Sequence, residues 1–269
     1  MGEFNSVLTQ SRNGVKTITL NRPNKRNALN PQLIAELTEA LHEAESCDCG
    51  VVILTGAGPA FCAGLDIEHL ALIDAKTADA KTAEHRIDFE NMAHVLRTLY
   101  EFPKPIIAAV NGPAIAGGMA LATITDFVLA VPTAKFGYTE VRVGSVPAIV
   151  ASFLLRQVGE LRARELLLSG RLIKAHEALS LGLITQIVAP EELLPMANAL
   201  AHNLLLNSPQ AMRAVKQLLA KHASRWLDEE IEDAIEINAE QSSTEDFKEG
   251  IAAFLAHRRP VWPSRPVKG

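Results

Sequence analysis

The stretch at residues 104–140 constrains the fold more than any other part of the chain. It begins with an apolar run over residues 105–110, short enough for a buried strand, which the turn sequence Asn-Gly-Pro at 111–113 stops. The pair Gly117-Gly118 follows, and the small apolar residues after it predict a helix packed tightly in a core. A Gly pair at a helix start lets other atoms approach the backbone and leaves N–H groups free at the positive end of the helix dipole. Such a start suits a phosphate, a carboxylate or the oxygen of a reacting carbonyl, although close packing alone also accounts for it.

A second glycine turn lies upstream, in the sequence FCAGLDI at residues 61–67. An apolar strand at 51–55 and a Gly-rich loop at 56–59 precede it, and we expect a helix after it. Two strand–turn–helix units in one domain can aim backbone N–H groups at a single point. The two turns together therefore predict a site for an oxygen that carries negative charge.

Composition and charge narrow the class of protein. The chain has 269 residues, 48% of them apolar and 21% charged, so it can bury a sizeable core and disorder is not expected. The net charge of −5 argues against nonspecific nucleic-acid binding. The chain has three cysteines, Cys47, Cys49 and Cys62, and this odd count is typical of a reducing compartment. No second Cys or His pair stands beside Cys47-Asp48-Cys49 in the sequence to complete a metal site. The first ten residues carry no export signal, and polar and turn residues interrupt the apolar region 105–131, so we expect a cytoplasmic protein without a membrane span.

Strands and helices alternate up to about residue 190, and helices alone follow, which predicts an α/β core with a helical tail. Near the start, we expect a hairpin through Asn13-Gly14 and a helix from Pro31 with Asn30 as its cap. The Ala- and Lys-rich segment 74–83 has no core stripe and is interpreted as a mobile segment near a pocket mouth or as a plain surface insertion. The later elements expected are buried helices at 147–158, 161–168 and 173–183, and a short strand near 187.

Three motifs, FCAGLDI, NGPAIAGGMALA and FGYTEVRVG, resemble the enoyl-CoA hydratase/isomerase (crotonase) superfamily. The resemblance runs from RPNKRNAL at 22–29 to FLAHRRP at 254–260, in the family's order and spacing. It implies an α/β fold, with a crotonase-like spiral of ββα units over residues 1–190 and a C-terminal α-helical region at 191–269 that packs in trimers. The implied assembly is a homotrimer or homohexamer. The implied partner is an acyl-CoA thioester substrate. No separate cofactor is expected, since coenzyme A is part of the substrate. No metal, nucleic acid or membrane partner is expected either.

The acid/base candidate is Glu140, because the mostly apolar stretch FGYTEV predicts a carboxyl in a poorly solvated pocket, where burial raises the pKa. A surface carboxylate paired with Arg142 is the other interpretation of this spacing. The resemblance aligns the family's second catalytic Glu with Glu140 and places the two oxyanion-hole N–H donors at Ala63 and Gly117. The substrate-binding residues that it implies are Lys25, Arg26, Ala28, Gly64, Leu65, Asp66, Ile67, Gly118 and Tyr138. Asp66 is also expected to cap the helix after its turn, and Arg258 or Arg259 of a neighbouring subunit to reach the nucleotide phosphate.

One position departs from the family's pattern. Many hydratases of the superfamily carry a first catalytic Glu three residues after the oxyanion-hole Gly, and Ala120 stands there in this chain. Three functions remain: hydration of a 2-enoyl-CoA with Glu140 as the sole acid/base, double-bond isomerisation of an enoyl-CoA by the same single Glu, and non-catalytic binding of acyl-CoA or, less in keeping with the acidic charge, RNA. We favour the hydratase. The sequence leaves the length and branching of the acyl chain open.

Overall fold

A computed structural model describes residues 5–223 and 227–265 of the chain. Its first elements are β1 (Val7–Arg12) and β2 (Val15–Leu20), an antiparallel hairpin whose turn residues Asn13 and Gly14 both have positive φ, as a two-residue hairpin turn requires. The sequence predicted this hairpin. The first four residues, which belong to the segment judged free of an export signal, lie outside the described residues.

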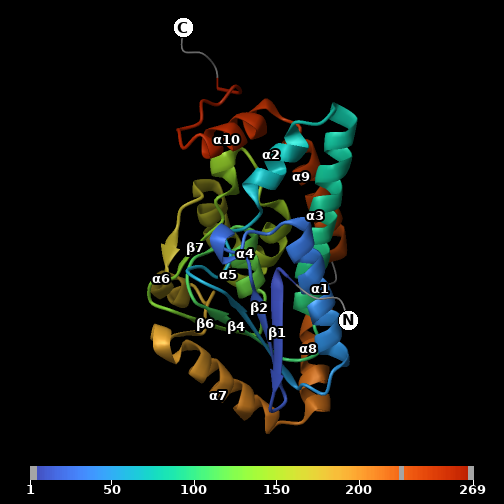
Figure 1. The fold of residues 1–269 in the computed structure, drawn as a ribbon, viewed down its shortest axis with the longest axis vertical. Helices are drawn as coiled ribbons and strands as arrows, with labels where there is room; N and C mark the ends of the chain where they lie inside the picture. The colour runs from blue at the N-terminus through green and yellow to red at the C-terminus, as the bar shows by residue number, and fades with distance from the viewer. Residues whose placement is uncertain (1–4, 224–226, 266–269) are drawn as a thin grey trace.

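Within the described residues, a six-stranded sheet in the order β1-β2-β3-β4-β6-β9 forms the centre of the fold (Figure 1). After the hairpin every neighbouring pair is parallel, through β3 (Val51–Gly56), β4 (Ile106–Val110), β6 (Phe127–Ala130) and β9 (Gln186–Ile187). All residues of β4, and all but the last of β3, are buried, because helices or loops cover both faces of a parallel sheet. A smaller sheet joins β5 (Ala114–Ile115), β7 (Lys135–Gly137) and β8 (Ile173–Lys174).

Helices between the strands complete the α/β part. Helix α1 (Pro31–Ser46) begins at Asn30, whose side-chain oxygen accepts a hydrogen bond from the N–H of Leu33 at 2.9 Å, as predicted. The other long or central helices are α2 (Ile67–Asp74), α3 (Ala78–Glu101), α4 (Gly117–Thr123), α5 (Ala148–Ser169) and α6 (Ala175–Ser180). Short 3-10 helices η1 (Pro23–Lys25), η2 (Glu140–Val143) and η3 (Pro190–Glu192) lie in the connections.

The segment at 74–83 joins two helices, and most of its described residues are exposed, in keeping with a surface segment. Helix α2 runs to Asp74 and α3 begins at Ala78, and only a short connection separates them. The side chain of Lys81 is buried and forms an ion pair with Asp74. A lysine that pairs inside the fold has the same sequence pattern as a solvated one, so composition did not reveal the burial of Lys81. The mobility of the segment stays a prediction.

The prediction of two buried helices at 147–158 and 161–168 was partly wrong. Helix α5 bends at Gly159, where φ is +74°, so the break is confirmed. The second half lies at the surface, with Leu161 78% and Leu168 76% exposed. The helix expected at 173–183 is shorter, because residues 173–174 form β8 before α6 begins.

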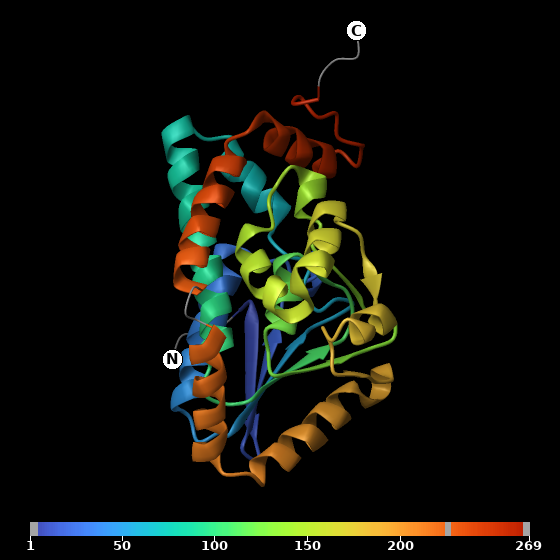
Figure 2. The same cartoon turned by 180° about the vertical axis from the view of Figure 1, so that it is seen from behind.

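Four helices, α7 (Leu193–Leu205), α8 (Pro209–Ala223), α9 (Leu227–Ser242) and α10 (Glu245–Leu255), form the C-terminal region, as predicted. Helix α7 contacts β3 and β4 of the sheet, and α9 packs against α3 and α5 (Figure 2). Helix α10 lies at the top of the molecule against α2 and η2, far from α7 (Figure 1). The trimer-forming role of this region and its boundary at residue 190 stay predictions.

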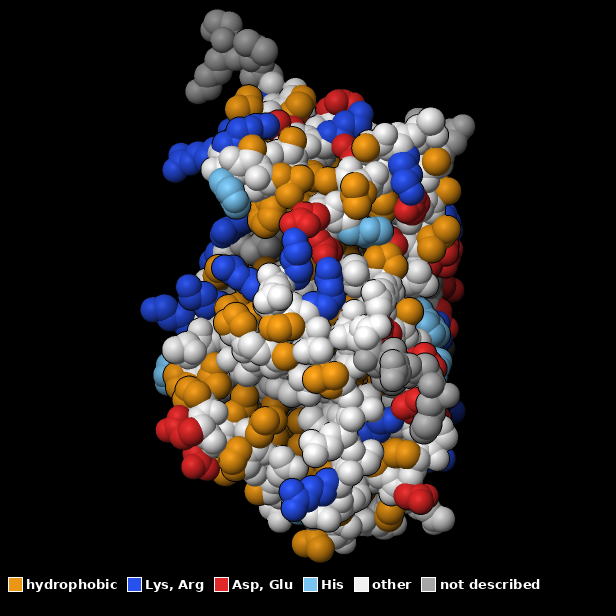
Figure 3. Space-filling model, viewed as in Figure 1, with side chains coloured by type: hydrophobic (Ala, Val, Ile, Leu, Met, Phe, Trp, Pro, Cys, Tyr) orange, Lys and Arg blue, Asp and Glu red, His pale blue; other side chains and the backbone are white. Residues whose placement is uncertain are grey.

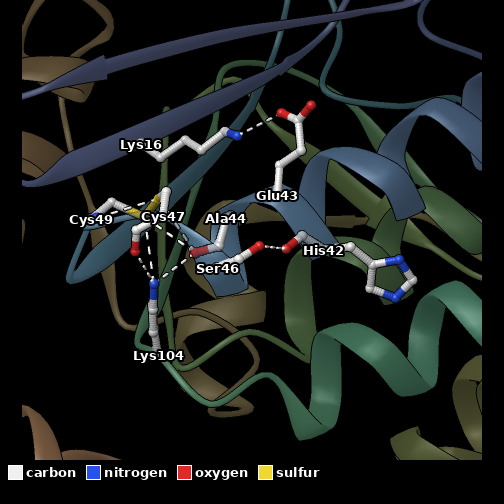
Figure 4. A network of polar contacts seen from close by, with 8 residues as sticks. All are labelled: Lys16, His42, Glu43, Ala44, Ser46, Cys47, Cys49 and Lys104. Carbon is white, nitrogen blue, oxygen red and sulfur yellow. Dashed lines mark hydrogen bonds and ion pairs between the residues drawn. A yellow bond between two sulfur atoms is a disulfide. The ribbon is translucent and has the colours of Figure 1, made fainter. Parts of the chain in front are cut away.

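The three cysteines form one pair and one single residue. The structure joins Cys47 to Cys49 in a disulfide at the end of α1 and leaves Cys62 free. Figure 4 shows the Lys104 ammonium group beside this pair, donating to the carbonyls of Ala44 and Cys47 at 2.7 and 2.8 Å. The reducing compartment expected from the cysteine count stays a prediction.

No helix in the described parts of the chain combines the length and apolar character needed to cross a bilayer. The apolar region 105–131 folds instead into strand, turn, helix and strand.

Candidate active site

The two glycine turns pack against each other, as the sequence predicted. The N–H of Ile115 donates to the carbonyl of Cys62 at 2.9 Å, and Cys62 and Ala114 form an isolated parallel bridge. A Cβ atom at Gly118 would lie 2.3 Å from the Cys62 carbonyl oxygen, and one at Gly64 would lie 2.9 Å from the Ile115 carbonyl oxygen. Backbone therefore meets backbone at distances that no side chain allows, which explains the glycines in both turns.

The amides of these turns differ in how far they are free. Among the described residues, no acceptor takes the N–H of Gly117, which opens α4 and has no carbonyl four residues back in the helix. Ala116 holds this amide in place with φ +52° and ψ −128°, a conformation that is strained for a residue with a side chain. The N–H of Ala63, in contrast, donates to the carbonyl oxygen of Arg26 at 3.0 Å. The expectation of two uncommitted amides is therefore wrong for Ala63 in this structure.

Glu140 begins η2, directly after the small sheet. One oxygen of its carboxyl group, Oε2, is out of contact with solvent and has no hydrogen-bond partner among the described residues. Burial raises the pKa of Glu140 to about 7, against a smaller opposing effect of a backbone hydrogen bond. A carboxyl with this pKa exchanges protons readily at neutral pH, as expected from its apolar surroundings.

A cavity of about 260 Å³ brings Ala63, Gly117 and Glu140 together. Apart from Glu140 and Arg26, its described walls carry no charged side chain, and Thr139, Ser145 and Asn238 are the other polar side chains in them. The remaining lining residues are Leu65, Ile67, Leu70, Phe89, Met92, Ile115, Ala116, Val143, Val146, Pro147, Ala148, Ile149, Val150, Phe247 and Phe254. Mostly apolar walls with a few polar groups suit a small organic ligand.

The loop at 22–28 forms part of the cavity rim through Arg26, and Asn27 fixes its shape. The buried amide nitrogen of Asn27 donates to the carbonyls of Ala57 and Ala60, both at 2.9 Å. Its amide oxygen accepts from the N–H of Arg22 at 2.8 Å. Arg26 and Asn27 both have positive φ, at 50° and 56°. Figure 3 shows Lys and Arg side chains gathered below α10, with some acidic side chains among them. A gathering of basic groups attracts anions.

Six of the twelve sequence-predicted site residues line the cavity: Arg26, Ala63, Leu65, Ile67, Gly117 and Glu140. Six do not: Lys25, Ala28, Gly64, Asp66, Gly118 and Tyr138. Asp66 caps α2 through the N–H of Glu68, as expected, and pairs with Arg22 at 2.9 Å. Lys25 pairs with Glu68 at 2.6 Å, and Gly64 and Gly118 belong to the packed turns.

Tyr138 and Cys62 lie inside the protein. The hydroxyl of Tyr138 is buried without a hydrogen-bond partner among the described residues, and burial raises its pKa above the ordinary value. Burial also raises the pKa of the Cys62 thiol to about 12, so it is not a nucleophile at neutral pH. At the other end of the chain, Arg258 binds Glu249 of its own chain, so its part in a neighbouring subunit's site stays a prediction.

Sequence reasoning missed the wall that the C-terminal helices contribute. Asn238 of α9 and Phe247 and Phe254 of α10 line the cavity, together with Phe89 and Met92 of α3. The signal available for Asn238 was a lone amide in the apolar stripe of an amphipathic helix.

With this fold and site in view, the chain belongs to the enoyl-CoA hydratase/isomerase (crotonase) superfamily: the family model described as enoyl-CoA hydratase/isomerase matches residues 10–265. It is 41% identical to a putative enoyl-CoA hydratase of Thermus thermophilus, over 91% of this chain and 96% of the relative. It is 34% identical to the 1,2-epoxyphenylacetyl-CoA isomerase of Escherichia coli, over 98% and 100%. The crystal structure of an enoyl-CoA hydratase/isomerase from Xanthobacter autotrophicus Py2 superposes with a TM-score of 0.86 at 28% identity, covering 95% of this chain and 98% of that one. The family resemblance and the crotonase-type α/β fold are thus confirmed.

Proposed function

We propose that the protein is an enoyl-CoA hydratase that adds water across the double bond of a 2-enoyl-CoA thioester. The observation that carries the proposal is the single carboxyl group of the cavity, Glu140, in a cavity that the Gly117 amide also lines. Relatives named enoyl-CoA hydratase support the reaction class. A homotrimer or homohexamer and a cytoplasmic location stay predictions for this chain.

In the proposed reaction, ionised Glu140 takes a proton from a water molecule, and the water oxygen bonds to C3 of the acyl chain. The electrons of the double bond move toward the thioester, and negative charge collects on its carbonyl oxygen. The Gly117 N–H donates a hydrogen bond to that oxygen, and removing such a donor typically raises the barrier by roughly 2.7–4 kcal/mol. Protonated Glu140 then delivers its proton to C2, which regenerates the carboxylate and completes the addition of one water.

A second oxyanion donor at Ala63 needs a local rearrangement. The Ala63 N–H is bonded to the Arg26 carbonyl, so the substrate oxygen has to share or displace that acceptor. Arg26 lies in the loop to which we assign coenzyme A, and binding of the nucleotide half there provides a means of shifting it. The hydroxyls of Thr139 and Ser145, which line the cavity near Glu140 in sequence, are candidates to hold the attacking water.

The isomerase remains the second candidate, because the missing first carboxylate favours it. Ala120 is fully buried in α4 and does not line the cavity, so position 120 supplies no acid. One carboxyl is sufficient to move a proton from C2 of a 3-enoyl-CoA to C4. The isomerase name of the Escherichia coli relative is consistent with this alternative.

An absorbance assay separates these functions. The hydratase predicts that a 2-enoyl-CoA loses the absorbance of its conjugated thioester when purified protein is added. The isomerase predicts that a 3-enoyl-CoA gains that absorbance while the 2-enoyl-CoA remains unhydrated. If neither changes while acyl-CoA binds measurably in calorimetry, the protein is a non-catalytic acyl-CoA binder and the hydratase proposal is wrong.

A further inference from the structure

Asn238 occupies a position where the pattern of its helix calls for an apolar residue. The buried face of α9 consists of Leu227, Ile231, Ala234, Ile235, Ala239 and, near its end, Ser242, whose hydroxyl bonds the Ala239 carbonyl at 2.7 Å. Asn238 lies in this stripe with 7% of its surface exposed. Its side-chain oxygen is buried and accepts no hydrogen bond from any described residue. A buried amide oxygen without a hydrogen-bond donor destabilises a protein, so a structural role alone does not account for it.

The same residue lines the cavity. Helix α9 packs between α3 and α5, whose cavity-lining side chains are apolar, as are those of α10. One turn after Asn238, the side-chain nitrogen of Gln241 donates to the Gly144 carbonyl at 3.0 Å. Gly144 directly follows η2, the 3-10 helix that Glu140 begins, so this bond ties α9 to the catalytic segment. The amide of Asn238 therefore has a fixed place within an otherwise apolar wall.

We propose that Asn238 is a specificity-determining residue whose side-chain oxygen accepts a hydrogen bond from a hydroxyl group on the acyl chain of the substrate. This inference rests on the proposed function, since it takes the cavity to be the acyl site. A plain hydrocarbon chain leaves the side-chain oxygen of Asn238 unpaired, whereas a hydroxyl at the right carbon of the chain donates a hydrogen bond to it. Because the unpaired atom is an acceptor, the preferred group is one that donates, a hydroxyl rather than a carbonyl or a carboxylate.

The test uses saturated acyl-CoA esters, which bind without reacting. Calorimetry compares hexanoyl-CoA with hexanoyl-CoA esters that carry a hydroxyl at C4, C5 or C6. For the unaltered protein, at least one hydroxyacyl ester is expected to bind about tenfold more tightly than hexanoyl-CoA, which is the effect of one buried hydrogen bond gained and one unpaired amide avoided. The variant Asn238→Leu, of similar shape, is expected to weaken binding of that ester and to tighten binding of hexanoyl-CoA, so that the preference is lost or reversed.

Ile235→Val serves as the matched control, because Ile235 is buried on the same helix face but does not line the cavity. It is expected to keep the tenfold preference. Equal affinity for all the esters in the unaltered protein, or an unchanged preference in Asn238→Leu, would overturn the inference. If Asn238→Leu does not fold, judged by circular dichroism, Asn238→Ala gives the same comparison. Failure of every acyl-CoA to bind the unaltered protein would instead reject the proposed function, so the two failures are distinguishable.

Discussion

The cavity has two walls that are built in different ways. The turn wall, formed by Ala63, Ala116, Gly117, Thr139 and Glu140, comes from loops at the ends of short strands. The helix wall, formed by Phe89, Met92, Ile149, Asn238 and Phe247, comes from four helices, α3, α5, α9 and α10. Backbone atoms in direct contact fix the first wall, whereas side chains alone form the surface of the second.

The difference separates chemistry from selectivity. In the turn wall, a shift of a few tenths of an ångström moves an N–H donor or the carboxyl group, and catalysis depends steeply on such positions. In the helix wall, a substitution changes the shape or polarity that an acyl chain meets. We therefore expect changes in the turn wall to affect turnover or stability, and changes in the helix wall to affect which substrate is preferred.

The largest effect is expected for Glu140→Gln. An acid/base group contributes typically 10²- to 10⁴-fold to rate, so kcat on a 2-enoyl-CoA should fall about 1,000-fold while acyl-CoA affinity stays within about threefold. Steady-state kinetics and calorimetry measure the two quantities separately. Glu191→Gln, at an exposed glutamate in η3, is the matched control and should retain full activity. Near-normal turnover in Glu140→Gln would remove Glu140 from the mechanism and leave the turn wall without its proton carrier.

The sequence predicted the turn wall well because its signals are local. Two glycine turns and an isolated acid in an apolar stretch are each contained within about ten residues, and the structure brings them together. The state of the Ala63 amide was not predictable, since it depends on Arg26 and Asn27 adopting positive φ without being glycines. The burial of Lys81, in a segment that is otherwise mostly exposed, likewise depends on a partner in another helix.

The helix wall could not be predicted for the same physical reason. Phe89 and Phe247 are far apart in the chain, and each belongs to an amphipathic helix whose apolar face looks like any other core face. Which of these side chains border an empty space depends on how four helices pack. No local pattern contains that information.

The next effect concerns stability, and it follows from the raised pKa of Glu140. Well below pH 4.5 the carboxyl group is protonated in both the folded and the unfolded chain, so its ionisation does not lower the free energy of unfolding. Between pH 4.5 and about 7 the unfolded chain releases this proton while the folded protein keeps it, so stability falls as pH rises. Above pH 7 the ionised carboxylate is buried at a cost of about 3 kcal/mol relative to the unfolded chain. Glu140→Gln removes this cost. Its free energy of unfolding should therefore be close to that of the unaltered protein at pH 4.5 and exceed it by about 3 kcal/mol at pH 8.

Urea unfolding at the two pH values measures this difference, and the comparison between walls sharpens it. Asn238→Leu in the helix wall should change stability by the same amount at both pH values, because no proton is involved. An equal difference between Glu140→Gln and the unaltered protein at pH 4.5 and pH 8 would mean that the carboxyl is well solvated. The interpretation of Glu140 as a buried acid would then be wrong.

The smallest effect tests whether backbone contact holds the turn wall in place. In Gly118→Ala the new methyl group would lie 2.3 Å from the carbonyl oxygen of Cys62, so one turn must move away from the other. Overpacking of this kind typically costs about 1–3 kcal/mol of stability. Because Gly117 precedes this residue, kcat should also fall, by about tenfold or more, through displacement of the N–H donor.

The matched control is Gly159→Ala, where φ is also positive at +74° but nothing lies within 4 Å of the new methyl group. It should show backbone strain of about 1–3 kcal/mol with normal kcat, since α5 bends there outside the cavity wall. Loss of stability in both variants with normal kcat in both would mean that the turns tolerate displacement, and that the rigid wall is not what positions the reacting oxygen.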